Sequence, residues 1–285
     1  MIRVLGTIFA GLLGLAFGSF LNVCVSRWPM GESIVQPASH CWACDRPLRW
    51  WENVPLVSWF ALRGRCRTCG APISARYVVV EALVGLGWAA VAWNGWNAAF
   101  PVAHIVGLCY FFWVLVALAV LDAEFLWLPD AITLPGIVVG FLWWLLQAEL
   151  AGWRLHTLQQ PWGDAGAIMR RALAIVIAAG IIFAIRGIYW LIRRREGIGL
   201  GDAKLMALLG AWLGLSGALL AFGIGVVLGA VAGLALLFFP SARAGDETWA
   251  ATKLPLGTFL CIGGIISTLW GGPIVEAYLR WAGFW

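Results

Sequence analysis

The sequence predicts an all-α protein that crosses a membrane several times. Hydrophobic residues make up 62% of the 285 residues and charged residues only 12%, a composition outside the range of soluble domains. Several apolar runs approach or exceed the roughly 20 residues that a spanning helix needs. The chain also has 20 tryptophans, which fit the aromatic belts at the two membrane surfaces.

About eight transmembrane helices are predicted. The first apolar run has the length of a span and no small-residue cleavage site follows it, so we expect a helix and not a cleaved signal. The sixth is short for a full crossing, so we expect it to tilt or to share its depth with non-helical backbone beside a cavity. The predicted spans lie near residues 4–23, 78–94, 102–121, 131–149, 170–191, 203–216, 218–239 and 256–273.

The basic residues predict how these helices are oriented. Of the 19 Lys and Arg, thirteen fall in 26–77, 193–204 and 240–255, five lie toward the opposite side of the membrane, and Arg186 lies within a span. Cytoplasmic loops are enriched in Lys and Arg. We therefore place those three segments in the cytoplasm and both termini outside. Membrane lipid is the partner this pattern requires, and no nucleic acid is expected.

The segment 26–77 is the only polar part of any size, and it carries two C-x-x-C pairs separated by 21 residues. This spacing fits a tetrahedral four-thiolate zinc site. Disulfides, free thiols and an iron–sulfur cluster are the alternatives, although a reducing cytoplasm disfavours disulfides. Four protein thiolates leave no open position for water, so the zinc would be structural. The predicted ligands are Cys41, Cys44, Cys66 and Cys69.

Two carboxylates are predicted at membrane depth. Asp202 follows Gly199 and Gly201 and opens an apolar segment, and Asp122 ends the third span. Under the predicted topology both lie at the cytoplasmic face. Carboxylates in such places are costly and usually mark function, although Asp202 alone also fits a helix cap.

Two close carboxylates can share one proton and act as general acid and general base in peptide hydrolysis. Asp130 fits the N-cap of the fourth span, and Lys204 either binds a partner or extends to the membrane surface. Two other classes remain open. A proton-coupled transporter also uses buried acids, but it leaves the cysteine loop without a role; a zinc-dependent scaffold uses the acids only as caps.

Several motifs together resemble the type IV prepilin peptidase family over most of the chain. The aspartate motifs are Asp122 with 128–130, and 199–204. The loop motifs are the two C-x-x-C pairs, 52–55 and 63–66. The remaining matches are 18–23 with Arg27 and Pro29, and 73–77 with Glu81.

The resemblance implies an intramembrane aspartyl protease of the GxGD type. It would cleave the leader of prepilins or pseudopilins at the cytoplasmic face of the bacterial inner membrane, and then N-methylate the new terminus with S-adenosylmethionine. Both chain termini would then be periplasmic. The implied catalytic pair is Asp122 and Asp202, with Gly199, Gly201, Asp130 and Lys204 in support.

The resemblance also implies a methyl-transfer element at Gly64 and Arg65, and here the chain departs from the family. Arg65 stands where the family usually has Lys, so a peptidase with weak or absent methylation is the alternative. The expected domains are a first transmembrane helix (1–25), a cytoplasmic zinc-binding loop (26–77) and a peptidase membrane domain (78–285).

Overall fold

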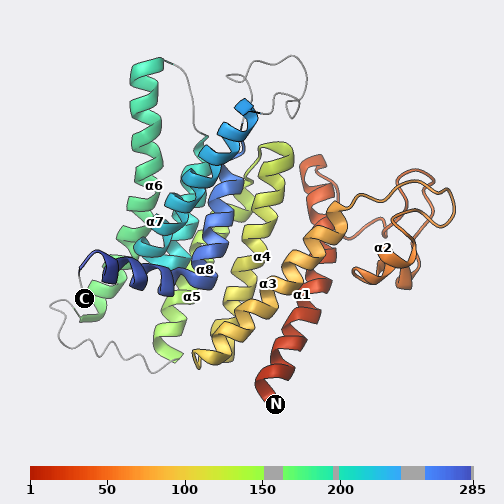
Figure 1. The fold of residues 1–285 in the computed structure, drawn as a ribbon, viewed down its shortest axis with the longest axis horizontal. Helices are drawn as coiled ribbons and strands as arrows, with labels where there is room; N and C mark the ends of the chain where they lie inside the picture. Colours follow the sequence, from red (N-terminus) through yellow and green to blue (C-terminus); the bar gives the residue numbers. More distant parts are fainter. Residues whose placement is uncertain (151–162, 195–198, 239–253, 284–285) are drawn as a thin grey trace. The chain divides into compact units, whose positions relative to one another are not determined.

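Helices supply nearly all regular structure in the described part of the chain (Figure 1). The structure is a computed structural model that describes residues 1–150, 163–194, 199–238 and 254–283. Within these described ranges, seven helices are long and apolar enough to cross a membrane, so the predicted all-α polytopic fold class is confirmed. They are α1 (Ile2–Arg27), α3 (Arg76–Asn97), α4 (Val102–Phe125), α5 (Asp130–Leu150), α6 (Gly163–Arg193), α7 (Leu200–Phe238) and α8 (Leu256–Trp281).

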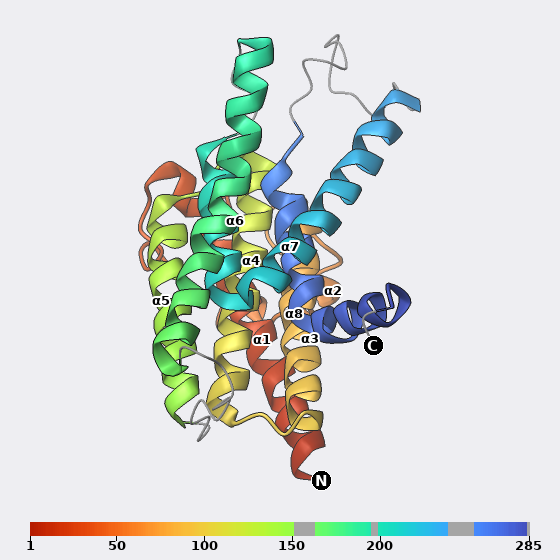
Figure 2. The ribbon, with the colours of Figure 1, turned by 90° about the vertical axis from the view of Figure 1, so that its left-hand side faces the viewer.

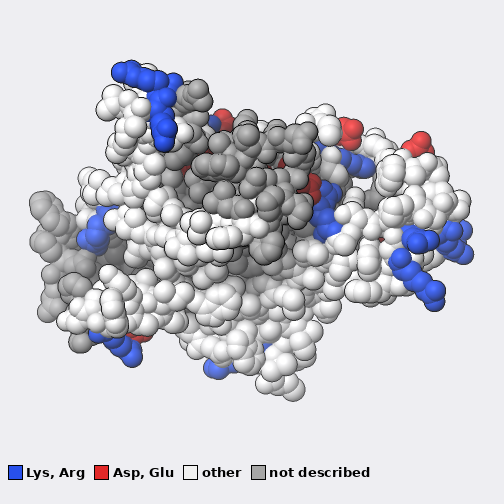
Figure 3. Space-filling view, turned by 45° about the horizontal axis from the view of Figure 1, so that its top comes forward, with Lys and Arg blue, Asp and Glu red and all other residues white. Residues whose placement is uncertain are grey.

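The outer faces of these helices are apolar. Phe9 on α1 is 63% exposed and Val176 on α6 is 66% exposed, which suits contact with lipid and not with water. Charged side chains gather in a few places on the face drawn in Figure 3, and wide areas between them carry no charge. The described surface is therefore that of a multi-pass membrane protein.

The chain forms two compact units, Met1–Ala117 and Leu118–Trp285. In the first unit α1 and α3 lie side by side (Figure 1). A Cβ at Gly14 would meet the Val84 carbonyl oxygen at 2.8 Å, and one at Gly18 would meet Glu81 Cα at 2.8 Å. The G-x-x-x-G spacing of these glycines lets the two backbones approach closely, as is common between membrane helices.

The segment between α1 and α3 contains only short helices: η1 (Trp28–Met30), η2 (Trp50–Asn53) and α2 (Val57–Ala61). Buried polar side chains of α1 hold both ends of it. Asn22 donates to the carbonyl of Tyr77, in the first turn of α3, at 3.0 Å, and Arg27 donates to the carbonyls of Ser33 and Pro37 within the segment at 2.9 and 2.7 Å. These bonds use groups at the end of α1 to order a loop that has little core of its own.

In the second unit, α7 consists of two helical halves that meet at Gly214, whose φ of 73° and ψ of −176° are not helical. The first half, 200–213, is about 21 Å long, shorter than the hydrocarbon core of about 30 Å. It runs beside α5, since a Cβ at Gly136 would meet Leu208 and one at Gly140 would meet Trp212.

The second half of α7 returns along α8. A Cβ at Gly217 would lie 3.3 Å from Ser267 Oγ, whereas one at Gly233 would meet Leu254 at 3.4 Å. The two helical halves of α7 therefore form a hairpin, in which the start of the first half and the end of the second half lie at the same end of the unit. Figure 2 shows the second half rising away from the bend.

The predicted spans six (203–216) and seven (218–239) correspond to the two halves of α7, with the break at Gly214 close to the predicted boundary. Among the described residues, seven helices are long and apolar enough to cross a membrane when the two halves of α7 are counted as one. Arg171 explains how the break is tolerated: its guanidinium lies 3.5 Å from the Ala211 carbonyl oxygen, which the broken helix leaves without its usual donor.

The contact between α7 and α8 predicts that an alanine substitution lowers the stability of the protein at one glycine but not at another. A Cβ at Gly263 would lie 2.1 Å from the Ala221 carbonyl oxygen, whereas nothing lies within 4 Å of a Cβ at Gly223. Gly263→Ala should therefore destabilise the protein by about 1–3 kcal/mol through overpacking, and Gly223→Ala should not. Thermal unfolding of both variants in detergent measures this; equal melting temperatures would contradict the packing described.

Candidate functional site

Cys41 and Cys66 each begin a tight backbone turn, and the two turns share one design. In each, the N–H of the cysteine donates to the carbonyl five residues later, at 2.9 and 2.8 Å. The residues after the second cysteines, Asp45 and Gly70, have positive φ values of 51° and 71°, and their N–H groups donate back to the first cysteine's carbonyl. Two identical turns thus present two thiols each.

The four predicted ligands come together. The sulfur atoms of the four cysteines lie within 4.8 Å of one another, and Cys41 Sγ and Cys69 Sγ are 3.7 Å apart. Zn–S bonds of about 2.3 Å in a tetrahedron put sulfur atoms about 3.8 Å apart. Backbone N–H groups of Cys69 and Thr68 lower the pKa of Cys66 from 9.0 to about 6, which favours the thiolate form. The donor set therefore fits zinc.

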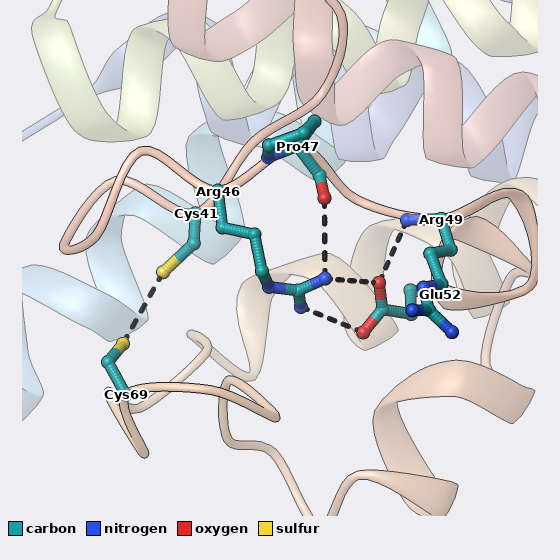
Figure 4. Close-up of polar contacts among 6 residues, drawn as sticks. All are labelled: Cys41, Arg46, Pro47, Arg49, Glu52 and Cys69. Atoms are coloured by element: carbon teal, nitrogen blue, oxygen red, sulfur yellow. Dashed lines mark hydrogen bonds and ion pairs between the residues drawn. The ribbon is translucent and has the colours of Figure 1, made fainter.

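An ion pair organises the loop beside this cluster (Figure 4). Arg46 donates to both oxygens of the buried Glu52 at 2.9 and 2.8 Å, and the Arg49 N–H donates to the same carboxylate at 2.8 Å. The Arg46 guanidinium, followed by the Arg49 N–H, lowers the pKa of Glu52 to about 2. This forked pair stays charged at any physiological pH and fixes the chain that follows Cys44.

Asp122, in the last turn of α4, is 6% exposed and meets the start of α8. Its Oδ2 accepts a hydrogen bond from the Thr258 N–H at 2.7 Å and from Thr258 Oγ1 at 3.2 Å. The free N–H groups of a helix start suit a carboxylate. Sequence reasoning missed Thr258; its only signal is a hydroxyl residue next to Gly257 at the start of an apolar run.

Asp202, in the first turn of α7, is 8% exposed and close enough to Asp122 for the two charges to interact. Leu128 lies between the starts of α7 and α8. A Cβ at Gly201 would meet its side chain at 3.1 Å, and one at Gly257 would meet it at 2.9 Å. The two predicted carboxylates therefore do come together, with a leucine from the turn between α4 and α5 packed beside them against Gly201 and Gly257.

The supporting residues lie around the same turn. Lys204 Nζ is 2.5 Å from Asp130 Oδ1, so Lys204 ties α7 to the first residue of α5. This pair is partly exposed and contributes at most about 1 kcal/mol to stability. A Cβ at Gly199 would meet Asp202 Oδ2 at 3.5 Å, an ordinary contact, so Gly199 is not required there by crowding.

The two residues predicted for methyl transfer have different surroundings. Gly64 is buried with φ of 63°, and a Cβ there would lie 2.9 Å from the ring of Trp59. Trp59 is in turn held by a bond from Nε1 to the Ile73 carbonyl at 3.1 Å. Arg65 is exposed. The space beside Gly64 is thus filled by an aromatic ring of the loop itself.

A helical membrane unit with paired buried carboxylates, joined to a four-cysteine loop, defines a class of membrane peptidase. Residues 12–95 match the bacterial Peptidase A24 N-terminal domain, and residues 109–234 match the type IV leader peptidase family. The chain belongs to the type IV leader peptidase family, which confirms the resemblance seen in its motifs.

Relatives match over nearly the whole chain. A protein of Stutzerimonas stutzeri is 32% identical over 95% of this chain and 93% of its own length. One from Xanthomonas campestris pv. campestris is 35% identical over 98% and 96%, and one from Myxococcus xanthus is 38% identical over 88% and 68%. Each is named prepilin leader peptidase/N-methyltransferase. No solved structure matches the chain.

The geometry of the thiols predicts one zinc ion per chain. Elemental analysis of the purified protein should find it, and Cys66→Ser should remove it because three thiolates and a hydroxyl bind zinc more weakly. Cys109→Ser is the matched control, since Cys109 is buried away from the four ligands. Iron in place of zinc, or full zinc content in Cys66→Ser, would contradict the assignment.

Proposed function

We propose that this chain cleaves the leader peptide of type IV prepilins or pseudopilins and then methylates the new N-terminal amine with S-adenosylmethionine. The observation that supports the peptidase activity is the pair of buried, interacting carboxylates. Asp122 lies in the last turn of α4 and Asp202 in the first turn of α7, both within the region 109–234 that matches the family. The names of the relatives carry the methyltransferase half.

The acid pair can perform hydrolysis without a metal ion at its centre. The ionised member takes a proton from water, and that water attacks the scissile carbonyl. The protonated member polarises the carbonyl and then gives its proton to the leaving amine. Thr258 donates to Asp122 Oδ2 and so fixes the orientation of this carboxylate.

The two implied cofactors have separate roles. Zinc would be held by Cys41, Cys44, Cys66 and Cys69 and would stabilise the loop, because a four-thiolate site offers no position for substrate. S-adenosylmethionine would supply the methyl group, with Gly64 and Arg65 as the candidate methyl-transfer element.

We further propose the functional division into 1–25, 26–77 and 78–285. The chain would lie in the bacterial inner membrane with the loop 26–77 and the acid pair at the cytoplasmic face and both termini in the periplasm. Positive charge supports this orientation, because most Lys and Arg lie in the segments it places inside.

The acid pair predicts that either aspartate is indispensable. Asp122→Asn and Asp202→Asn should each lower cleavage of a co-expressed prepilin by at least about 10³-fold, as expected when general acid–base catalysis is removed. Asp130→Asn is the comparison: it breaks only the partly exposed pair with Lys204 and should reduce cleavage far less. Full processing by either pair variant, seen as mature pilin on a gel, would rule out the aspartyl mechanism.

The methyl-transfer element predicts that the two activities separate. Gly64→Val should impair methylation more than cleavage, because its side chain would displace Trp59; Arg65→Ala should do so through loss of its charge. Arg63→Asn is the control, since Arg63 is exposed and Asn tolerates its positive φ. Mass spectrometry of the mature pilin N-terminus reads both reactions at once. Parallel loss of both would show that the loop only supports the peptidase.

A further inference from the structure

A cavity of about 880 Å³ lies in the first unit, between the cysteine loop and the adjoining ends of α1 and α3. Small-molecule sites have volumes of about 300–1,000 Å³, so the cavity is large enough for a nucleoside-sized ligand. Its wall includes Cys41 and Cys66, which the metal would hold in place. The cleavage mechanism makes no use of it, since all its lining residues belong to the first unit.

One wall of this cavity is aromatic. Phe20, Trp59 and Tyr77 line it, and the Trp59 ring is fixed from two sides. Its Nε1 donates to the Ile73 carbonyl at 3.1 Å, and the ring packs at 85° to the ring of Phe60 with centroids 5.3 Å apart. A fixed indole face suits stacking on a flat heteroaromatic ring and attracts a neighbouring cation.

A buried acid lines the same cavity. Glu81 lies within the membrane helix α3 and is 7% exposed. Its Oε2 accepts a hydrogen bond from the Leu56 N–H at 2.8 Å, but no residue in the described part of the chain pairs with Oε1. Glu52, which also lines the cavity, is by contrast neutralised by Arg46. A buried carboxylate without an ion-pair partner is costly, and a cationic ligand would offset that cost.

Glu81 also holds a strained turn at the cavity wall. Leu56 has φ of 60° and ψ of −54°, and the Val57 N–H reaches back to the Pro55 carbonyl at 2.6 Å. This is a γ-turn of the rare, strained kind. Such strain persists only where the surroundings enforce it, and it gathers at ligand sites. Pro55 lines the cavity, so the strained segment forms part of the wall.

We propose that this cavity binds S-adenosylmethionine, with the adenine against the aromatic wall and the Glu81 carboxylate attracting the sulfonium charge. The proposal rests on the methyltransferase half of the proposed function. In the transfer, a C–N bond forms to the pilin amine, the S–C bond breaks with its electron pair returning to sulfur, and the amine gives up a proton to water. S-adenosylhomocysteine has no charge on sulfur, so the attraction to Glu81 ends with the reaction.

The test is equilibrium binding of radiolabelled S-adenosylmethionine and S-adenosylhomocysteine to the full-length protein in detergent. Glu81→Gln keeps an acceptor for the Leu56 N–H but removes the charge. It should weaken binding of S-adenosylmethionine by about tenfold or more, as for loss of a charge-assisted contact, and leave S-adenosylhomocysteine binding almost unchanged. Asp45→Asn is the matched control, because Asp45 carries the same charge in the first unit but does not line the cavity.

A second variant pair tests the cavity without touching its charge. Ser19 lines it from α1, so Ser19→Trp should fill it and weaken binding of both ligands. Leu12→Trp places the same ring on an outer face of α1, where the Leu12 side chain is 61% exposed, and should change the binding of neither ligand. This pair decides the question if Glu81→Gln does not elute as a folded, helical protein.

Two results would overturn the proposal. One is wild-type binding of S-adenosylmethionine by Ser19→Trp. The other is a folded Glu81→Gln variant that binds S-adenosylmethionine as the wild type does, or that loses both ligands equally. Failure of the methyltransferase function itself looks different: wild-type protein would then cleave prepilin but neither bind S-adenosylmethionine nor methylate the product.

Discussion

Burying a carboxylate in a helical membrane unit is costly unless hydrogen-bond donors meet it, and this constraint shapes the second unit. Asp122 is buried, and the donors that meet it are the backbone N–H and hydroxyl of Thr258 at the start of α8. That contact fixes where α8 begins relative to α4. It also sets the place of Leu128, which fits only because Gly201 and Gly257 have no side chains.

The second constraint in this unit is close helix packing through glycine. Gly210 lies against the Ala174 backbone of α6, and Gly263 lies against the Ala221 backbone of α7. These contacts hold both halves of a broken helix, while Arg171 serves the carbonyl at the break. The result is a short helix that carries Asp202 into the unit and a second half that returns to the same end.

In the first unit, the loop between α1 and α3 is ordered by charge and sulfur more than by apolar burial. This loop is too short to bury a core, so two matched turns, a forked Arg46–Glu52 pair and the Glu81 contact to Leu56 order it. Each of these also borders the cavity. A loop built in this way combines a rigid frame with a polar, aromatic interior, which is the combination that a small charged ligand requires.

The sequence by itself determined the helical membrane class, the set of four cysteines and the two aspartates, because composition, C-x-x-C spacing and an acid in an apolar run are local signals. Its functional assignment of the aspartates and of Gly64 and Arg65 stays a prediction. Only the tertiary structure decided the rest. Thr258 meets Asp122 across 136 positions, and the second half of α7 turns back along α8, with Gly217 near Ser267. A side chain at Gly64 would collide with the Trp59 ring. The Glu81 carboxylate accepts a hydrogen bond from Leu56, 25 residues earlier in the chain. Such partners are set by packing in space, which no local pattern of residues records.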